Sequence, residues 1–355
     1  MREAILREVG DLLVTHAYTN GPQVGEFERA FAEYVGARVC VGMASGLDAL
    51  RLALVGSGLR TGEEVIVPAN SFVATFEAVS QAGGVPVPAE VSEDDYNLDP
   101  AAAEAAVGDR TRALLPVHLY GLPADLRALR RLAVDKDLGL LEDACQAHGA
   151  SRDGFRAGTV GFAAAFSFYP GKNLGAAGDA GAVVTDDEEL ADRLRALREH
   201  GQWRKYEHRF EGFTARLDTV QAIVLLHKLR HLERWNGQRR AAARYYGEAL
   251  AGVGDLLLPG EPEGARHVWH LYVVRTAGRD ALAEHLRENG IGTGLHYPEP
   301  PHLSAAYAHL GYGRGAFPVT ERLAHEVLSV PMFPGITERQ LETVVAAINA
   351  FFDGA

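Results

Sequence analysis

The chain has 355 residues, 47% of them hydrophobic, and a formal net charge of -12. This length and composition suit one large folded domain or two moderate ones. The acidic balance argues against nucleic acid or an anionic membrane as the main partner, because both require a basic surface. No stretch approaches the ~20 apolar residues of a membrane span, and acids interrupt the apolar pattern of the first residues. We therefore expect a cytoplasmic protein.

Two cysteines, Cys40 and Cys145, each lie inside an apolar stretch. This placement favours buried free thiols in a reducing compartment. A disulfide between them remains an open alternative, because its formation depends on geometry that a sequence does not carry.

Amphipathic segments alternate with short apolar runs from about residue 23 to residue 200. Val/Leu/Ile-rich strands that alternate with helices are typical of a mainly parallel sheet covered on both faces. The pattern therefore predicts a three-layer α/β/α domain. Its expected helices span residues 24–36, 47–58, 71–83 and 124–137, and its expected strands span 38–43, 63–69, 85–90, 112–121 and 139–144.

The alternation of amphipathic segments and apolar runs ends at about residue 200. Residues 216–250 carry a helical pattern without proline, which predicts one long helix that connects domains. Further helices and strands follow and favour a small α+β domain. We predict a large domain over residues 1–240 and a small C-terminal domain over residues 241–355. The expected elements of the small domain are strands at 267–276 and 326–333 and helices at 279–290 and 337–354.

Open sheets of this type bind ligands where their strands end, so the strand exits hold the candidate site residues. The first exit reads VGMASGLDAL and turns into a helix at Ser45, Gly46 and Leu47. Small residues there let backbone N–H groups and a helix N-terminus face an anion such as a phosphate. An ordinary helix N-cap by Ser45 is the alternative.

The second exit, in GLLEDACQAHGA, places Glu142 and Asp143 at the end of an apolar strand. A carboxylate there can cap a turn, hold a metal or pair with a cationic ligand, and a solvated loop acid is the alternative. His148 is the only further metal ligand nearby, so the pattern does not favour a metal site.

The third exit holds Lys172, in SFYPGKNLGAAGDAGAVVTDD. An apolar strand is expected on each side of this loop, over residues 163–170 and 182–187. Lysine is rarely placed between buried strands, because desolvation of its ammonium is unfavourable. Burial lowers the pKa of a lysine, so such a residue can serve as a nucleophile. The alternatives are a lysine that extends to the surface or binds a phosphate.

One cofactor accounts for all three exits. Pyridoxal phosphate has an aldehyde that forms a Schiff base with lysine, a pyridinium nitrogen that needs an acid, and a phosphate that needs backbone donors. Lys172, Asp143 and the turn at residues 45–47 supply these groups in turn. We therefore predict a pyridoxal 5'-phosphate site without a metal.

Six segments in a fixed order carry a resemblance to a known family: VPANSFVATFEAV, VHLYGLPADL, EDACQAHGA, FSFYPGKNLGAAGDAGAVVTDD, RLDTVQAIVL and GLHYPEPPHL. In this combination the chain resembles the sugar aminotransferases of the DegT/DnrJ/EryC1/StrS type. The resemblance covers nearly the whole sequence, and it implies the PLP-dependent aspartate-aminotransferase fold (fold type I).

The resemblance implies roles for individual residues of the cofactor site. Lys172 would carry the cofactor and move the proton between substrate and cofactor, and Asp143 would pair with the pyridinium nitrogen. Phe72, in NSFVAT, would stack on the cofactor ring, and Gln146 would lie near its hydroxyl. The phosphate would be held by Ser45 and Ser167 together with the amides of Gly46 and Leu47. Many relatives have threonine where Leu47 stands, so we expect a backbone contact there.

Three more positions come from the resemblance alone. The family usually has an asparagine before RLD that reaches the cofactor of the neighbouring subunit, and here GFTARLD offers Thr214. Thr214 is thus expected either to make this contact in a homodimer with shared active sites or to be a plain loop residue. His296 and Tyr297, in GLHYP, match the segment that approaches the nucleotide sugar. Packing within the small domain is their alternative role.

The implied reaction is a two-stage transamination. L-glutamate, the usual donor of the family, would supply the amino group to a keto sugar linked to a nucleotide, which we expect to be dTDP. SFYPGKNLGAAGDAG, with SGLDAL and HLYGLPADL, looks most like members that act on 3-keto-6-deoxyhexoses in deoxysugar and antibiotic biosynthesis. A 4-keto sugar is the alternative. Lys172 argues against a dehydratase of the family, and the acidic charge argues against a DNA-binding regulator built on this fold.

Overall fold

The computed structural model describes residues 1–354. Its centre is a seven-stranded sheet with the strand order β1-β9-β8-β5-β4-β2-β3. The pairs β2–β3, β2–β4, β4–β5 and β5–β8 are parallel, and β9 is antiparallel to both of its neighbours. The expected mainly parallel α/β sheet is confirmed. Its strands are β1 (Val39–Met43), β2 (Glu64–Pro68), β3 (Val85–Ala89), β4 (Thr111–Leu114), β5 (Gly139–Asp143), β8 (Ala163–Ser167) and β9 (Gly181–Thr185).

Apolar cores cover both faces of the sheet. Successive strand residues point to opposite faces, so each strand contributes to both cores. Ala165 and Val183 belong to the apolar core on one face, and their neighbours Ala164 and Val184 belong to the core on the other. The large domain therefore has the three layers expected from its sequence. Its helices are α2 (Pro22–Val35), α3 (Gly46–Gly56), α4 (Val73–Gln81), α5 (Pro100–Ala105), α6 (Leu126–Asp135) and α7 (Glu188–Leu197), and the N-terminal helix α1 (Arg2–Thr15) packs against α8 (Thr219–Leu229).

The single long helix predicted over residues 216–250 is wrong. The segment forms two helices, α8 (Thr219–Leu229) and α9 (Leu232–Ala249), which are separated at Arg230 and His231. Neither proline nor glycine marks the break. The two helices pack against different cores: α8 contributes to the core beneath the sheet, and most apolar residues of α9 pack with the C-terminal segment. Tertiary packing has overridden a continuous helical pattern.

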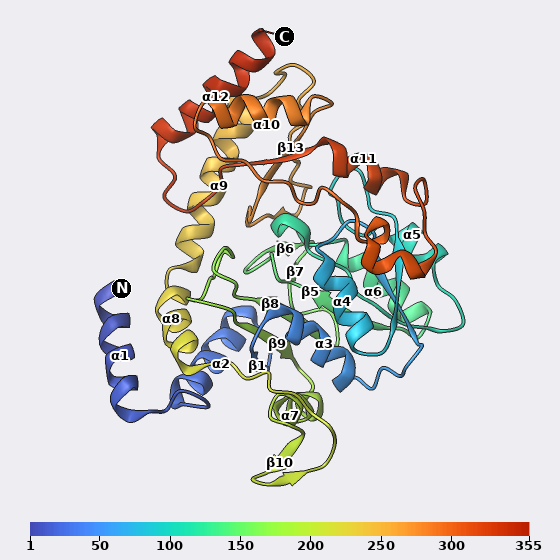
Figure 1. The fold of residues 1–355 in the computed structure, drawn as a ribbon, viewed down its shortest axis with the longest axis vertical. Coiled ribbons are helices and arrows are strands. Elements are labelled where there is room, and N and C mark those ends of the chain that lie inside the picture. The colour runs from blue at the N-terminus through green and yellow to red at the C-terminus, as the bar shows by residue number, and fades with distance from the viewer. Residues whose placement is uncertain (355) are drawn as a thin grey trace.

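The C-terminal part has its own apolar core, whose buried residues all lie between positions 242 and 348. Figure 1 shows α9 rising from the region of the sheet to α10 and α12. The predicted boundary at residues 240 and 241 falls inside α9 and stays a prediction. The C-terminal elements are β13 (Tyr272–Arg275), α10 (Arg279–Glu288), α11 (Pro318–Glu326), β14 (Val327–Val330) and α12 (Glu338–Asp353).

Three shorter features complete the chain. A hairpin of β10 (Gln202–Arg204) and β11 (Glu207–His208) protrudes beyond α7 (Figure 1). A three-stranded sheet joins β6 (Ser151–Arg152), β7 (Phe155–Arg156) and β12 (Ala265–Arg266), and 3-10 turns cover Leu119–Gly121, Pro301–Leu303 and Ala305–Leu310. Both cysteines are free thiols, so the disulfide alternative is excluded. Within residues 1–354, no helix is long and apolar enough to cross a membrane.

Candidate active site

A cavity of about 530 Å³ opens where the central strands end. Asp143 is the last residue of β5, Ser167 is the last residue of β8, and Ser45 follows β1 by two positions. The three strand exits singled out in the sequence thus meet at one site, as expected for an open α/β sheet. Of the predicted site residues, the cavity is lined by Ser45, Gly46, Leu47, Phe72, Asp143, Gln146, Ser167, Lys172, His296 and Tyr297.

Asp143 is only 6% exposed, so it is not a solvated loop acid. Its Oδ1 accepts a hydrogen bond from the backbone N–H of Cys145 at 3.1 Å, and its Oδ2 accepts one from the Thr75 hydroxyl at 3.2 Å. Thr75 Oγ1 is in turn paired with Ser71 Oγ at 2.7 Å. These contacts hold the carboxylate in one orientation toward the cavity, where it can pair with a ligand cation.

The N-terminus of α3 forms a close-fitting cradle. Ser45 caps the helix, since its Oγ accepts the backbone N–H of Asp48 at 3.0 Å. The N-cap alternative is therefore correct for the Ser45 side chain, although the residue also lines the cavity. A Cβ added to Gly46 would lie 2.6 Å from Ser167 Cβ, so only glycine lets the backbone pass here. The first N–H groups of the helix then face an anion that enters the cavity.

Lys172 lies on the loop between β8 and β9 and points into the cavity. Burial lowers the pKa of its ammonium group, and the nearby Cys145 and Asp143 partly oppose this effect. The loop turns tightly: a Cβ at Gly175 would lie 2.4 Å from the carbonyl oxygen of Pro170. A lysine with a lowered pKa in a cavity is suited to nucleophilic and proton-transfer chemistry.

The two helices α8 and α9 hold this loop from outside the cavity. Lys228 Nζ donates to the carbonyl of Gly175 at 2.6 Å, and Gln221 Oε1 accepts the N–H of Ala177 at 2.8 Å. The amide of Asn173, which directly follows Lys172, donates to Asn236 Oδ1 at 2.9 Å. These contacts of the residues that follow Lys172 therefore restrain the loop that carries it.

Aromatic and amide side chains line the opposite wall. The rings of Phe72 and Tyr297 lie 5.4 Å apart between centroids, and Gln146 Nε2 donates to the Tyr297 hydroxyl at 3.2 Å. His296 Nδ1 is paired with Ser329 Oγ of β14 at 2.8 Å. His296 and Tyr297 both line the cavity, so they do more than pack the C-terminal part of the chain. Their role toward a substrate stays a prediction.

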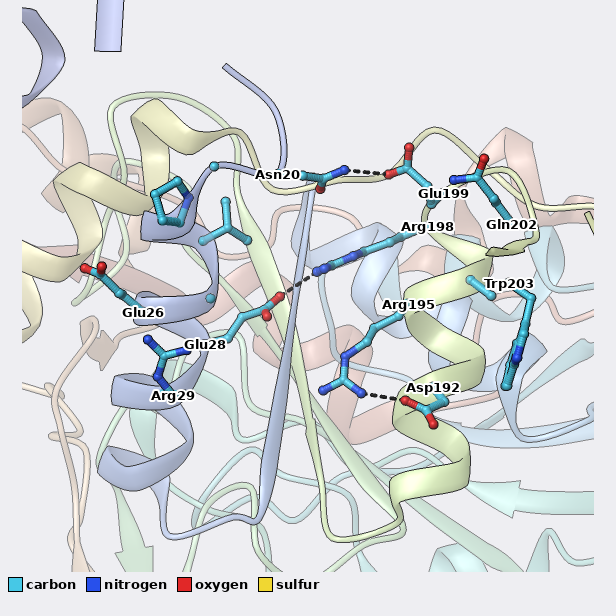
Figure 2. Close-up of a pocket in the computed structure, with 15 residues that line it drawn as sticks. Asn20, Glu26, Glu28, Arg29, Asp192, Arg195, Arg198, Glu199, Gln202 and Trp203 are labelled. Carbon is cyan, nitrogen blue, oxygen red and sulfur yellow. Dashed lines mark hydrogen bonds and ion pairs between the residues drawn. The ribbon is translucent and has the colours of Figure 1, made fainter. Parts of the chain in front are cut away.

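A second cavity, of about 760 Å³, lies between α2 and α7 (Figure 2). Two of its arginines are paired with acids: Arg198 pairs with Glu28 at 2.6 Å and Arg195 pairs with Asp192 at 2.7 Å. Asn20 donates to Glu199 at 3.1 Å across the opening (Figure 2). Neither Lys172 nor the buried carboxylate of Asp143, which line the smaller cavity, lies here. The reactive groups therefore identify the smaller cavity as the active site.

A family model described as the DegT/DnrJ/EryC1/StrS aminotransferase family matches residues 1–349. The chain belongs to this family. It is 50% identical over 333 residues to the erythromycin biosynthesis sensory transduction protein EryC1 of Saccharopolyspora erythraea, with 94% of this chain and 91% of that protein covered. It is also 49% identical over 341 residues to a dTDP-3-amino-3,4,6-trideoxy-alpha-D-glucose transaminase of Streptomyces venezuelae, with 96% and 90% covered.

A solved structure gives the same result in three dimensions. The chain matches S. venezuelae DesV in complex with a ketimine intermediate at a TM-score of 0.97 and 48% identity, with 99% of this chain and 95% of that chain covered. The aspartate-aminotransferase fold predicted from the sequence is confirmed. This protein of the DegT/DnrJ/EryC1/StrS family is an aminotransferase, and the cofactor of the family is pyridoxal phosphate.

The side chains of this aminotransferase fit that cofactor. The site supplies a half-buried lysine, a buried carboxylate, an aromatic ring and a helix N-terminus whose glycine leaves no room for a Cβ. Lys172 would hold the aldehyde, Asp143 the ring nitrogen, and the N–H groups of residues 46 and 47 the phosphate. When bound, the cofactor supplies an electron sink for the carbon that gains or loses the amino group.

Thr214 does not line the cavity of its own chain. It is exposed, and its hydroxyl pairs with His200 Nε2 at 3.1 Å beside the hairpin of β10 and β11. This position leaves its predicted contact with a neighbouring subunit untested. Such a contact stays a prediction for this aminotransferase.

Several residues of the cavity were missed by the sequence analysis. Thr75 and Ser71 follow from NSFVAT only once the turn of α4 is known, since they meet at helical spacing below Asp143. His270 lies in a segment read from its apolar pattern as part of a strand, whereas β13 begins only at Tyr272. Tyr169 and Asp179 also line the cavity. The sequence signal that could have indicated His270 as a site residue is its polar side chain within an apolar segment.

Glu142 has a structural role. Its side chain is fully buried, as is that of His118, and within residues 1–354 no cluster of three metal-ligating side chains exists. Burial alone would raise the pKa of Glu142, but His118 and backbone N–H groups outweigh this effect and lower it. The carboxylate accepts hydrogen bonds of 2.7–2.9 Å from His118 Nε2 and from the N–H groups of Gly158, Val160 and Gly161.

Glu142→Gln is expected to destabilise the fold by about 3 kcal/mol, because its amide group would face N–H donors. The lowered folded pKa means that the carboxylate stabilises the fold above its unfolded pKa of 4.5, and that this contribution is lost as pH falls through the folded value. Urea unfolding of both proteins at pH 7 and pH 4 measures the effect. Glu104→Gln, at a residue with a 60% exposed side chain, is the control. Equal stability of the wild type and Glu142→Gln at pH 7 would contradict this role.

Proposed function

We propose that this aminotransferase transfers the amino group of L-glutamate to C3 of a dTDP-linked 3-keto-6-deoxyhexose. The observation that carries the proposal is that every predicted site residue except Thr214 lines one cavity, combined with 49% identity to a transaminase named for a dTDP-3-amino sugar. The product would be a 3-amino sugar nucleotide for deoxysugar and antibiotic biosynthesis. Its buried site and free cysteines suit a cytoplasmic enzyme.

The side chains of the cavity have separate roles in this reaction. The lowered pKa of Lys172 favours a neutral amine, so Nζ can take the proton from the carbon of the donor that bears nitrogen and return a proton to the sugar carbon. Asp143 stabilises positive charge opposite this lysine. Phe72 and Tyr297 would form an apolar wall that orients the ring of the ligand and excludes water.

A 4-keto sugar nucleotide is the alternative substrate. The choice of C3 is supported by the name of the S. venezuelae relative, since no residue of the cavity distinguishes the two carbons by its chemistry alone. A regulatory role is disfavoured by the lowered pKa of Lys172 in the cavity, which a binding protein does not require.

We further propose that the active unit is a homodimer. The hairpin that precedes Thr214 exposes Trp203 (40%) and Tyr206 (81%), and α1 exposes Leu13 and Val14. Exposed apolar groups on protruding elements are typical of a subunit interface. Sedimentation velocity should give twice the 38.2 kDa mass of the chain. A fully active monomer would contradict the shared active site.

The substrate assignment is tested with the purified enzyme and pyridoxal phosphate. L-glutamate should bleach the absorption of the bound cofactor, and a 3-keto sugar nucleotide should then restore it with formation of a 3-amino product. Mass spectrometry and NMR of the product identify the aminated carbon. Amination of the 4-keto compound alone would overturn the choice of C3, and absence of bleaching by L-glutamate would overturn the choice of donor.

A further inference from the structure

The active site contains a histidine side chain that the proposed reaction does not use. His270 precedes β13 and lines the cavity together with Lys172. Its backbone is fixed from outside, because the buried Arg239 of α9 donates to the carbonyls of Trp269 and His270 at 3.0 and 3.1 Å. The position of the imidazole is therefore set by the fold before any ligand binds.

A chain of buried amides determines which nitrogen of His270 carries the proton. Asn236 Nδ2 donates to the carbonyl of His148 at 2.8 Å, so its Oδ1 must be an acceptor. Asn173 Nδ2 donates to that Oδ1 and to the carbonyl of Val268, both at 2.9 Å. The remaining atom of Asn173 is Oδ1, which lies 3.2 Å from His270 Nδ1. Because Asn173 Oδ1 can only accept, Nδ1 of His270 is the donor.

Among residues 1–354, the His270 ring makes its hydrogen bond through Nδ1, and none is found at the other nitrogen, Nε2. The titratable neighbours that act on the ring are Lys172, Arg239, His148 and His296. Burial lowers the pKa of His270 well below its usual value, and these cationic or basic neighbours lower it further. The ring is thus neutral near pH 7, with a free lone pair on Nε2 toward the cavity.

A lone pair in this place selects its ligand by chemistry. It repels a carboxylate, a ketone oxygen has no proton to donate, and the ammonium group of L-glutamate is the group that reacts with the cofactor. A sugar hydroxyl is a hydrogen-bond donor and matches it. Lys172 and His270 line the same cavity and are close enough for Lys172 to lower the pKa of His270, so this acceptor lies in the region of the reactive amine.

We propose that His270 Nε2 accepts a hydrogen bond from a ring hydroxyl of the keto sugar and thereby distinguishes the sugar from the amino donor. The proposal rests on the proposed function, because it requires a sugar in this cavity. It makes His270 a substrate-binding residue used in the second half of the reaction and not in the first.

Two variants separate the nitrogens of the ring. The side chain of His270→Asn places an amide NH₂ near Nδ1, so it keeps the contact with Asn173 and removes the acceptor at Nε2. His270→Gln reaches the position of Nε2 and supplies an acceptor there. We expect His270→Asn to raise KM for the keto sugar nucleotide by about tenfold, as for a lost hydrogen bond, and His270→Gln to recover most of this loss. The rate of bleaching by L-glutamate should change less than twofold in both.

The tautomer has a readout that needs no substrate. NMR spectra of the holoenzyme labelled with ¹⁵N-histidine, compared with the spectrum of His270→Asn, should show a neutral His270 ring protonated on Nδ1 at pH 7. A proton on Nε2 would overturn the proposal, as would an unchanged KM in His270→Asn or an equal loss in the glutamate step. If the wild type aminates no keto sugar, the proposed function and the hydroxyl ligand fail together, while the NMR spectrum still decides the tautomer.

Discussion

Lys172→Ala is expected to abolish amino transfer, with a loss in kcat of at least about 10⁴-fold. Among the described residues, Lys172 is the only lysine that lines the cavity, so no other amine can replace its Nζ. Burial lowers its pKa, and the loop contacts of Asn173 and Gly175 fix its backbone. The variant should fold normally, because alanine at position 172 leaves the contacts of Asn173 and Gly175 in place.

The measurement is spectroscopic and chemical. Borohydride reduction of the wild-type holoenzyme, followed by proteolysis and mass spectrometry, should attach the cofactor to the peptide that contains Lys172. Lys172→Arg keeps the positive charge but cannot form the Schiff base, and it should be as inactive as Lys172→Ala. Lys136→Ala removes a lysine at the surface, where it pairs with Glu104 at 3.3 Å, and should behave as the wild type. Labelling of another lysine would refute the assignment.

Strand exits made the chemical core of the site predictable. Ser45, Asp143 and Lys172 lie far apart in the sequence, but each follows a short apolar run, and the exits of neighbouring strands share one edge of a sheet. The rule needs only local pattern and composition. It therefore brought these three residues to one ligand before their positions were known, and the alternation of helices and strands predicted the covering layers.

Residues placed by long-range packing were not predictable in this way. His270 enters the cavity because Arg239 and Asn173, from other parts of the chain, fix its backbone and ring. The break between α8 and α9 has no local signal, and it allows Lys228 of α8 and Asn236 of α9 to hold the same loop. Such contacts depend on how distant segments meet, and apolar periodicity within one segment carries no information about them.

Asp143→Asn is expected to lower kcat by about 10²–10³-fold while the fold is retained. The carboxylate is the negative charge that would hold a proton on the ring nitrogen of the cofactor, and a neutral amide of the same shape removes that charge. The amide can still satisfy both neighbours. Its oxygen can accept the N–H of Cys145, and its nitrogen can donate to the Thr75 hydroxyl, which then donates to Ser71. We therefore expect a change in unfolding free energy below about 1 kcal/mol.

Stopped-flow measurement of the L-glutamate half-reaction reports this loss directly, because bleaching of the cofactor precedes any contact with the sugar. His270→Asn should leave this step intact, so the two variants assign the carboxylate and the imidazole to different halves of the reaction. Asp135→Asn removes the same charge at a residue whose side chain is 58% exposed, and it should react as the wild type does. If Asp143→Asn bleached at the wild-type rate, the carboxylate would be a structural partner of Thr75 and Cys145, and the charge opposite Lys172 would have to come from another group of the cavity.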